Sequence, residues 1–157
     1  MEKTKKVWTV YIVILLVIAF FMAVKLTQNE EEGWGDEAEL TITNSNGNET
    51  ELTVEVARTW EEKTTGLSQR ESLPEDSGML FVFDEDVDSH FTMEDTSIPL
   101  SIAFIDKHGD ILDIQKMEPL SDESYSCSTE YRYALEVSRG FFEENDIQAG
   151  DNVDIRK

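Results

Sequence analysis

Two charged side chains lie in otherwise apolar surroundings, and their chemistry needs an explanation. Arg70 follows shortly after Leu67, and Glu136 interrupts the apolar run from Tyr133 to Val137. A charge near an apolar core usually has a partner, because an unpaired buried charge is costly. We therefore expect a structural Arg–Glu bridge, which we favour, or a polar pocket wall that contains both residues.

The pocket alternative includes two further side chains. Met93, in a strand predicted at 90–94, and Thr96, just after it, could complete a cleft with the two charges. Methionine on a strand more often fills a core, so Met79, Met93 and Met117 could equally be core residues. The candidate pocket therefore consists of Arg70, Met93, Thr96 and Glu136.

Alternating carboxylates raise the question of a metal site. Asp84, Asp86 and Asp88 could offer oxygen ligands to Ca²⁺. The spacing is incomplete, since Ser89 stands where an EF-hand loop needs glycine and Asp95 where it needs glutamate. We expect a solvated acidic loop, no specific metal and no cofactor.

A cysteine nucleophile is also considered. Cys127 is the only cysteine of the chain, so no intrachain disulfide can form. With His90 or His108 as a base, it would still need a donor for the oxyanion, and no glycine-rich elbow or helix start follows it. We predict no catalytic residue.

An uncharged stretch near the start indicates a membrane anchor. Residues 7–24 would span about 27 Å as a helix, close to the thickness of the hydrocarbon core. Lysines precede the stretch and glutamates follow it, so residues 1–6 should be cytoplasmic and the C-terminal domain extracytoplasmic. The competing interpretation is a cleaved signal peptide, but the stretch is long and lacks a small-residue cleavage site.

The composition is strongly acidic, with 34 Asp and Glu, 13 Lys and Arg and a net charge of −21. Nucleic acid is a poor partner, because phosphate contacts require basic residues. Such a charge repels itself in a compact fold, and the Debye length falls to about 3 Å in 1 M salt. We interpret the charge as an adaptation to high salt; the alternative is an ordinary acidic surface domain.

The sequence after the anchor predicts an acidic linker at residues 25–38. One small domain should follow over residues 39–157. A turn at 44–48 separates strands 39–43 and 50–57, and Thr59 and Glu62 form a capping box for a helix to about residue 68 or 70. Further strands are expected at 79–83, 90–94, 100–106, 111–117, 133–137 and 152–156, with a second helix at 138–145. This pattern predicts an α+β, mainly β sandwich or barrel with two short helices. Asn48 begins a glycosylation sequon in the first turn.

An ordered set of residues resembles the family called domain of unknown function 192, over about residues 52–156. The residues that carry the resemblance are Gly66-Leu67, Arg70, Leu73-Pro74, Gly78 to Phe81, Phe91, Met93, Thr96, Pro99-Leu100, Ala103 to Asp106, Met117 to Pro119, Tyr133 to Val137, Gly140 and Gly150-Asp151. The resemblance implies a compact β-rich domain, often behind a signal or anchor segment, with no established biochemical activity. The chain departs from the family at Thr92, Glu94 and Asp95, where relatives have Trp, Lys and Asn, and at Ser101, where they have Asp.

Three functions remain open. The first is a non-enzymatic binding or interaction module of the cell envelope, anchored through residues 7–24, with an envelope protein or a small molecule as partner. The alternative is an enzyme that acts on envelope material through a polar cleft near Arg70 and Glu136. A third reading is an accessory for the stability or assembly of another membrane protein.

Overall fold

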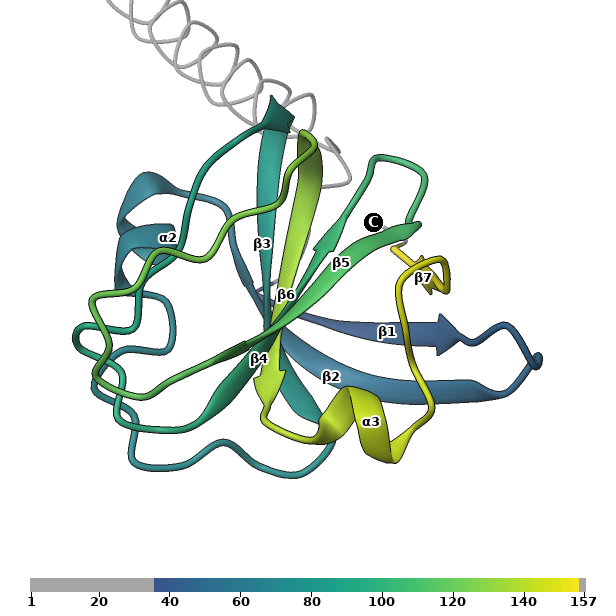
Figure 1. Ribbon diagram of the computed structural model, residues 1–157, viewed down its shortest axis with the longest axis horizontal. Helices are drawn as coiled ribbons and strands as arrows, with labels where there is room; N and C mark the ends of the chain where they lie inside the picture. The colour runs from purple at the N-terminus through teal and green to yellow at the C-terminus, as the bar shows by residue number, and fades with distance from the viewer. Residues whose placement is uncertain (1–35, 156–157) are drawn as a thin grey trace, which may run out of the picture. The chain divides into compact units, whose positions relative to one another are not determined.

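The computed structural model describes residues 36–155, which form a mainly β fold around one curled, seven-stranded sheet (Figure 1). In the sheet the strands lie in the order β5-β4-β6-β3-β2-β1-β7. The strands are β1 (Glu37–Thr43), β2 (Glu49–Ala57), β3 (Ser77–Val87), β4 (Leu100–Ile105), β5 (Ile111–Met117), β6 (Tyr131–Ser138) and β7 (Asn152–Asp154). Two short helices, α2 (Trp60–Thr65) and α3 (Phe141–Glu144), accompany them.

The sheet curls into a half-barrel, and its two outermost strands meet at one point. Asp110 pairs with Asn152 in an isolated bridge, and the amide of Val153 donates to the carbonyl of Gly109 at 2.8 Å. All strand pairs are antiparallel except β2 and β3. These two strands are parallel, and the chain passes through α2 between them. The predicted barrel-like alternative is therefore correct, and two stacked sheets are not present in the described part.

Two apolar clusters lie on opposite faces of the sheet. The inner cluster includes Leu135 and Val137 of β6 together with Phe142 of α3. The outer cluster includes Ala134 of the same strand, together with Phe81 of β3. The separation follows from the period of two in a strand, which sends alternate side chains to opposite faces. All six residues of β4 are buried, as the apolar run in the sequence predicts.

Both predicted helices form, but each is shorter than expected. The capping box is present, since the side chain of Thr59 accepts from the amide of Glu62. Gly66 follows with a φ of 50° and ends α2, well before residue 68 or 70. The second helix begins after Gly140 rather than at residue 138, because Gly140 takes a positive φ of 99° at the N-cap.

One predicted strand is wrong, and one predicted loop is a strand. Residues 90–94 form no sheet strand, because their backbone bonds go to another loop: Phe91 exchanges hydrogen bonds of 2.8 and 2.9 Å with Tyr125. The acidic run starting at Asp84 continues β3 as far as Val87 instead of leaving the sheet. Val87 pairs with Tyr131 across a bulge, and this pairing extends the strand.

The predicted tail, anchor and most of the linker, at residues 1–35, lie outside the described residues. Within residues 36–155, no helix is long and apolar enough to cross a membrane. β1 begins at Glu37, slightly before the predicted domain start at residue 39.

Candidate functional site

Glu136 is a buried acid in the middle of the sheet. It points to the outer face, since its neighbours Leu135 and Val137 point inward. On that face it stands between Met79 of β3 and Ile102 of β4, its partners in the two ladders. The residue is only 5% exposed. Burial among apolar side chains raises the pKa of Glu136 to about 8, because the charged form is poorly solvated there.

Within residues 36–155, the carboxyl group of Glu136 has neither a hydrogen-bond donor nor an ion-pair partner. It reaches a hollow of about 530 Å³ between α2 and the loop of residues 88–99, which we call the Glu136 groove. Its lining residues come from β3, β6, α2 with the turn after it, and that loop: Trp60, Lys63, Thr64, Thr65, Gly66, Leu67, Ser68, Phe81, Phe83, Ser89, His90, Phe91, Thr92, Glu94, Asp95, Thr96 and Glu136. A buried polar group that faces a cavity of this size is a feature of ligand sites.

The loop that forms one wall of the groove is fixed by several contacts. The ring of Phe91 packs edge-on against Phe81, with centroids 5.0 Å apart. The hydroxyl of Tyr131 donates to the carbonyl of Ser89 at 2.8 Å. The amide of Gln69, in the turn after α2, donates to the carbonyl of Asp95 at 3.0 Å and joins the two walls. The groove is thus bounded by backbone hydrogen bonds and aromatic contacts.

Lys63 brings a cation to the aromatic part of the groove. Its Nζ lies 4.5 Å from the centroid of the Phe83 ring. Burial lowers the pKa of Lys63, against a smaller raising effect of Asp84 and Glu62. An ammonium group over an aromatic face is a favourable arrangement, so this lining can hold an organic cation.

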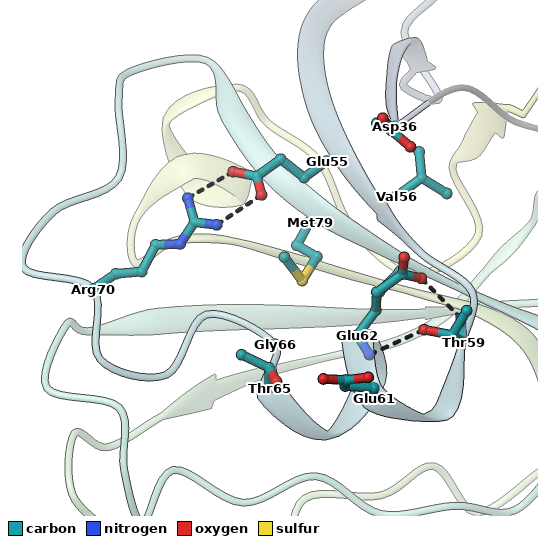
Figure 2. A pocket seen from close by; sticks show the side chains of 11 residues that line it. Asp36, Glu55, Val56, Thr59, Glu61, Glu62, Thr65, Gly66, Arg70 and Met79 are labelled. Carbon is teal, nitrogen blue, oxygen red and sulfur yellow. Dashed lines mark hydrogen bonds and ion pairs between the residues drawn. The ribbon is translucent and has the colours of Figure 1, made fainter.

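A second hollow, of about 600 Å³, lies between α2 and β2 and contains Arg70 (Figure 2). Arg70 donates to both carboxylate oxygens of Glu55 at 2.6 Å. Glu62, also in this hollow, is bound by the amides of Arg58 and Thr59 at 2.8 Å. Arg70 and Glu55 bind each other and Glu62 binds backbone amides, which makes this hollow a poorer ligand site than the groove.

The four residues of the predicted pocket therefore separate. Thr96 and Glu136 line the same groove, whereas Arg70 lies in the second hollow. Met93 is 1% exposed and packs in the outer cluster, as the core alternative for methionine predicts. The expected bridge between Arg70 and Glu136 is wrong, because Arg70 binds Glu55.

The remaining candidates are dispersed. Asp86 binds Arg132 at 2.9 Å, while Asp84 and Asp88 are exposed. No group of three or more His, Cys, Asp and Glu side chains able to hold a metal occurs in the described range. The Cys127 thiol lies 3.4 Å from the Thr129 hydroxyl. Asn48 is exposed in the turn between β1 and β2.

Sequence reasoning missed three residues of these sites. Glu55 belongs to the alternating pattern of β2 and gives no sign that it binds an arginine from another segment. Lys63 and Phe83 are far apart in sequence, and only the parallel connection through α2 brings them together. The acid in the apolar run of β6 was the signal that located the groove.

Comparisons with known proteins identify relatives of the domain. The model of the family DUF192, described as "Uncharacterized ACR", matches residues 41–155. No protein with a curated description matches the chain.

Two solved structures resemble the fold closely. A protein from Sinorhizobium meliloti 1021, described as a "putative transcription regulator", has 27% identity and a TM-score of 0.74, over 78% of this chain and 97% of that protein. A protein of unknown function from Novosphingobium aromaticivorans DSM 12444 has 27% identity and a TM-score of 0.72, over 76% of this chain and 85% of that protein. Both are similar to the domain over most of their own length.

Proposed function

The chain belongs to the DUF192 family, and we propose that its β-rich domain is a non-enzymatic binding module that holds a small molecule in the Glu136 groove. One observation carries the proposal: a carboxyl group, 5% exposed and without a partner in residues 36–155, faces a hollow of about 530 Å³. A buried acid without a partner destabilises a fold. A ligand that supplies a hydrogen bond or a charge would compensate that cost.

The environment of Glu136 supports binding more than catalysis. Its neighbours in the sheet, Met79 and Ile102, are apolar and cannot move a proton. The candidate pocket named from sequence retains Thr96 and Glu136 in this proposal and loses Arg70 and Met93. Aromatic rings with a few polar groups are typical of binding pockets.

An enzyme remains the second candidate, on one observation. The pKa of Glu136, raised to about 8 by burial, suits a general acid or base at neutral pH. Such a mechanism would need a second polar group, and Thr96 and His90 line the same groove. The enzyme alternative therefore moves away from Arg70, which binds Glu55 in the other hollow.

We also propose that the domain is held outside the cytoplasm by an anchor at residues 7–24 and is adapted to high salt. The uncharged stretch, its lysine flank and the net charge of −21 support this proposal. Protease added to intact cells should remove the domain. Protection in intact cells, with digestion after lysis, would contradict the proposed orientation.

A nucleic-acid partner is not part of the proposal. The relative from Sinorhizobium meliloti is described as a "putative transcription regulator", but this chain has 34 acidic and 13 basic residues. Binding to DNA phosphates requires neutralisation by Lys and Arg. An envelope protein or a small molecule fits the charge better.

Binding in the groove can be tested by ligand-observed NMR on the full chain with a library of small molecules. Thr92→Trp, at an exposed lining position, should fill the groove and abolish binding of the hits. Ser124→Trp, at an exposed position outside the groove, is the matched control and should retain them. Hits that survive Thr92→Trp would contradict the assigned site, and conversion of a hit into product would favour the enzyme.

A further inference from the structure

The ionisable groups of the Glu136 groove are mainly acidic. Glu136 from β6 lies in the groove, and Glu94 and Asp95 come from the loop of residues 88–99. Lys63 from α2 and His90 from the loop are the basic or titratable groups that face them. The groove therefore carries an excess of carboxylates within a domain that is itself strongly acidic. An anionic ligand would be repelled by the carboxylates of the groove and by the net negative charge of the domain.

The apolar part of the groove is aromatic. Phe81, Phe83 and Phe91 all line it. The Lys63 ammonium already lies 4.5 Å from the centre of the Phe83 ring, so one aromatic face of this site holds an ammonium group of the chain itself. Aromatic faces attract cations, most strongly where water is partly excluded.

We propose that the ligand of the groove is a small organic ammonium ion, whose charged nitrogen binds the Glu136 carboxylate and whose apolar part packs on the phenylalanine rings. This inference rests on the proposed function, because it specifies the ligand of the same groove. A hollow of about 530 Å³ is large enough for a small molecule.

A bare metal ion fits less well than an organic cation. Ca²⁺ and Mg²⁺ need several oxygen ligands, whereas the buried part of the groove supplies one carboxyl group among aromatic rings. No metal-binding group of three or more suitable side chains occurs between residues 36 and 155. The combination of one acid and several rings selects a cation that has an apolar body.

The proposed ion pair couples binding to the release of a proton. Burial raises the pKa of Glu136 to about 8, so the free groove holds a neutral acid at lower pH. An ammonium ion favours the carboxylate, so the acid proton passes to solvent when the ligand binds. Affinity should therefore rise with pH up to about 8. His90, Glu94, Asp95 and Lys63 are the other titratable groups that line the groove, and burial lowers the pKa of Lys63.

The test uses n-butylammonium with two matched probes of similar size, neutral 1-butanol and anionic butyrate. Binding is followed by amide NMR shifts of the full chain at pH 6 and pH 9. We expect butylammonium to shift amides of the groove, such as those of Thr64 and Thr96, and to bind at least about tenfold more tightly at pH 9. The other two probes should bind about tenfold more weakly or not at all.

Two substitutions identify the groups responsible. Glu136→Gln keeps the shape of the neutral acid and should reduce the affinity for butylammonium by about tenfold or more at pH 9. Lys63→Met removes the competing ammonium from Phe83 and should increase the affinity several-fold. Unchanged affinity in both variants would overturn the inference.

The outcomes also separate the ligand class from the binding function. If butanol or butyrate shifts the same amides as strongly as butylammonium, the ammonium class is wrong, but the groove remains a binding site. If none of the three shifts groove amides, the ammonium class is again wrong. The library screen with Thr92→Trp then decides the binding function separately.

Discussion

Arg70 and Glu55 form a bidentate ion pair in which each carboxylate oxygen accepts a hydrogen bond of 2.6 Å. The pair connects the turn after α2 to β2. The hydrogen bonds that Arg70 donates to Glu55 raise the pKa of Arg70, so the guanidinium stays charged. α2 itself has no buried residue, so the α2 region is attached to the sheet by this bridge and by Leu67, which is 2% exposed in the outer cluster.

Breaking the bridge should have a modest effect that depends on salt. Both side chains are more than a third exposed, so screening limits the loss of unfolding free energy to about 1 kcal/mol or less. Arg70→Lys keeps the charge but loses the planar fork, and it should recover only part of that energy. A double-mutant cycle with Glu55→Gln measures the coupling by urea unfolding. A coupling that does not weaken between low and high salt would contradict this description.

The capping box should stabilise α2 directly. Thr59→Ala removes the acceptor for the Glu62 amide and should cost about 1 kcal/mol of unfolding free energy. Thr65→Ala, at an exposed position near the end of the same helix, is the matched control and should cost much less. Equal losses in chemical denaturation would show that the cap contributes little.

A side chain at Gly109 should destabilise the fold, because Gly109 lies where the ends of β5 and β7 come into contact. A Cβ there would lie 2.3 Å from the carbonyl oxygen of Val153, and the φ of 91° adds backbone strain. Gly150 has a similar φ of 95° but open space around its Cβ position. Gly109→Ala should therefore destabilise the domain more than Gly150→Ala, which carries only the strain of about 1 kcal/mol. Similar melting temperatures for the two variants would mean that the strands do not approach this closely.

Glu136 should make the domain less stable as pH rises. Its folded pKa of about 8 lies above the ordinary value of 4.5, so between these pH values the folded state binds one more proton than the unfolded state. Unfolding free energy should then fall by about 1.4 kcal/mol per pH unit across the window and lose no more above it. Glu136→Gln should remove this contribution and be the more stable protein at pH 9.

The control for this experiment is Glu85→Gln, an exposed position of β3. It should follow the wild-type dependence of stability on pH, measured by urea unfolding from pH 5 to pH 9. If Glu136→Gln followed the same curve as well, the buried acid would not be the source of the slope.

Sequence patterns predicted the elements whose signals are local. The turn at Asn44 to Asn48, the cap at Thr59 and the buried run of β4 all depend on neighbouring residues, and the structure contains each of them. Residues 90–94 have a strand-like composition, but their partner is another loop, and a local pattern does not reveal this.

The candidate site was predicted only in part for the same reason. Glu136 and Thr96 lie in apolar or loop segments that drew attention, and the fold brings both to one groove. Arg70 was assigned the wrong partner: Glu55 and Glu136 lie on the same face of the sheet, on either side of Met79, and Arg70 binds the acid of β2 rather than that of β6. Pairing across distant strands decides such contacts, and a single sequence does not contain that information.

The side-chain carboxyl ¹³C shift of Glu136, followed by NMR through a pH titration of the full chain, tests the central claim most directly. We expect a midpoint near pH 8 for the free protein and a lower midpoint when butylammonium is present. A midpoint near the ordinary value of 4.5 in the free protein, unchanged by the amine, would show that the carboxyl is already solvated or paired, and the groove would lose its proposed role.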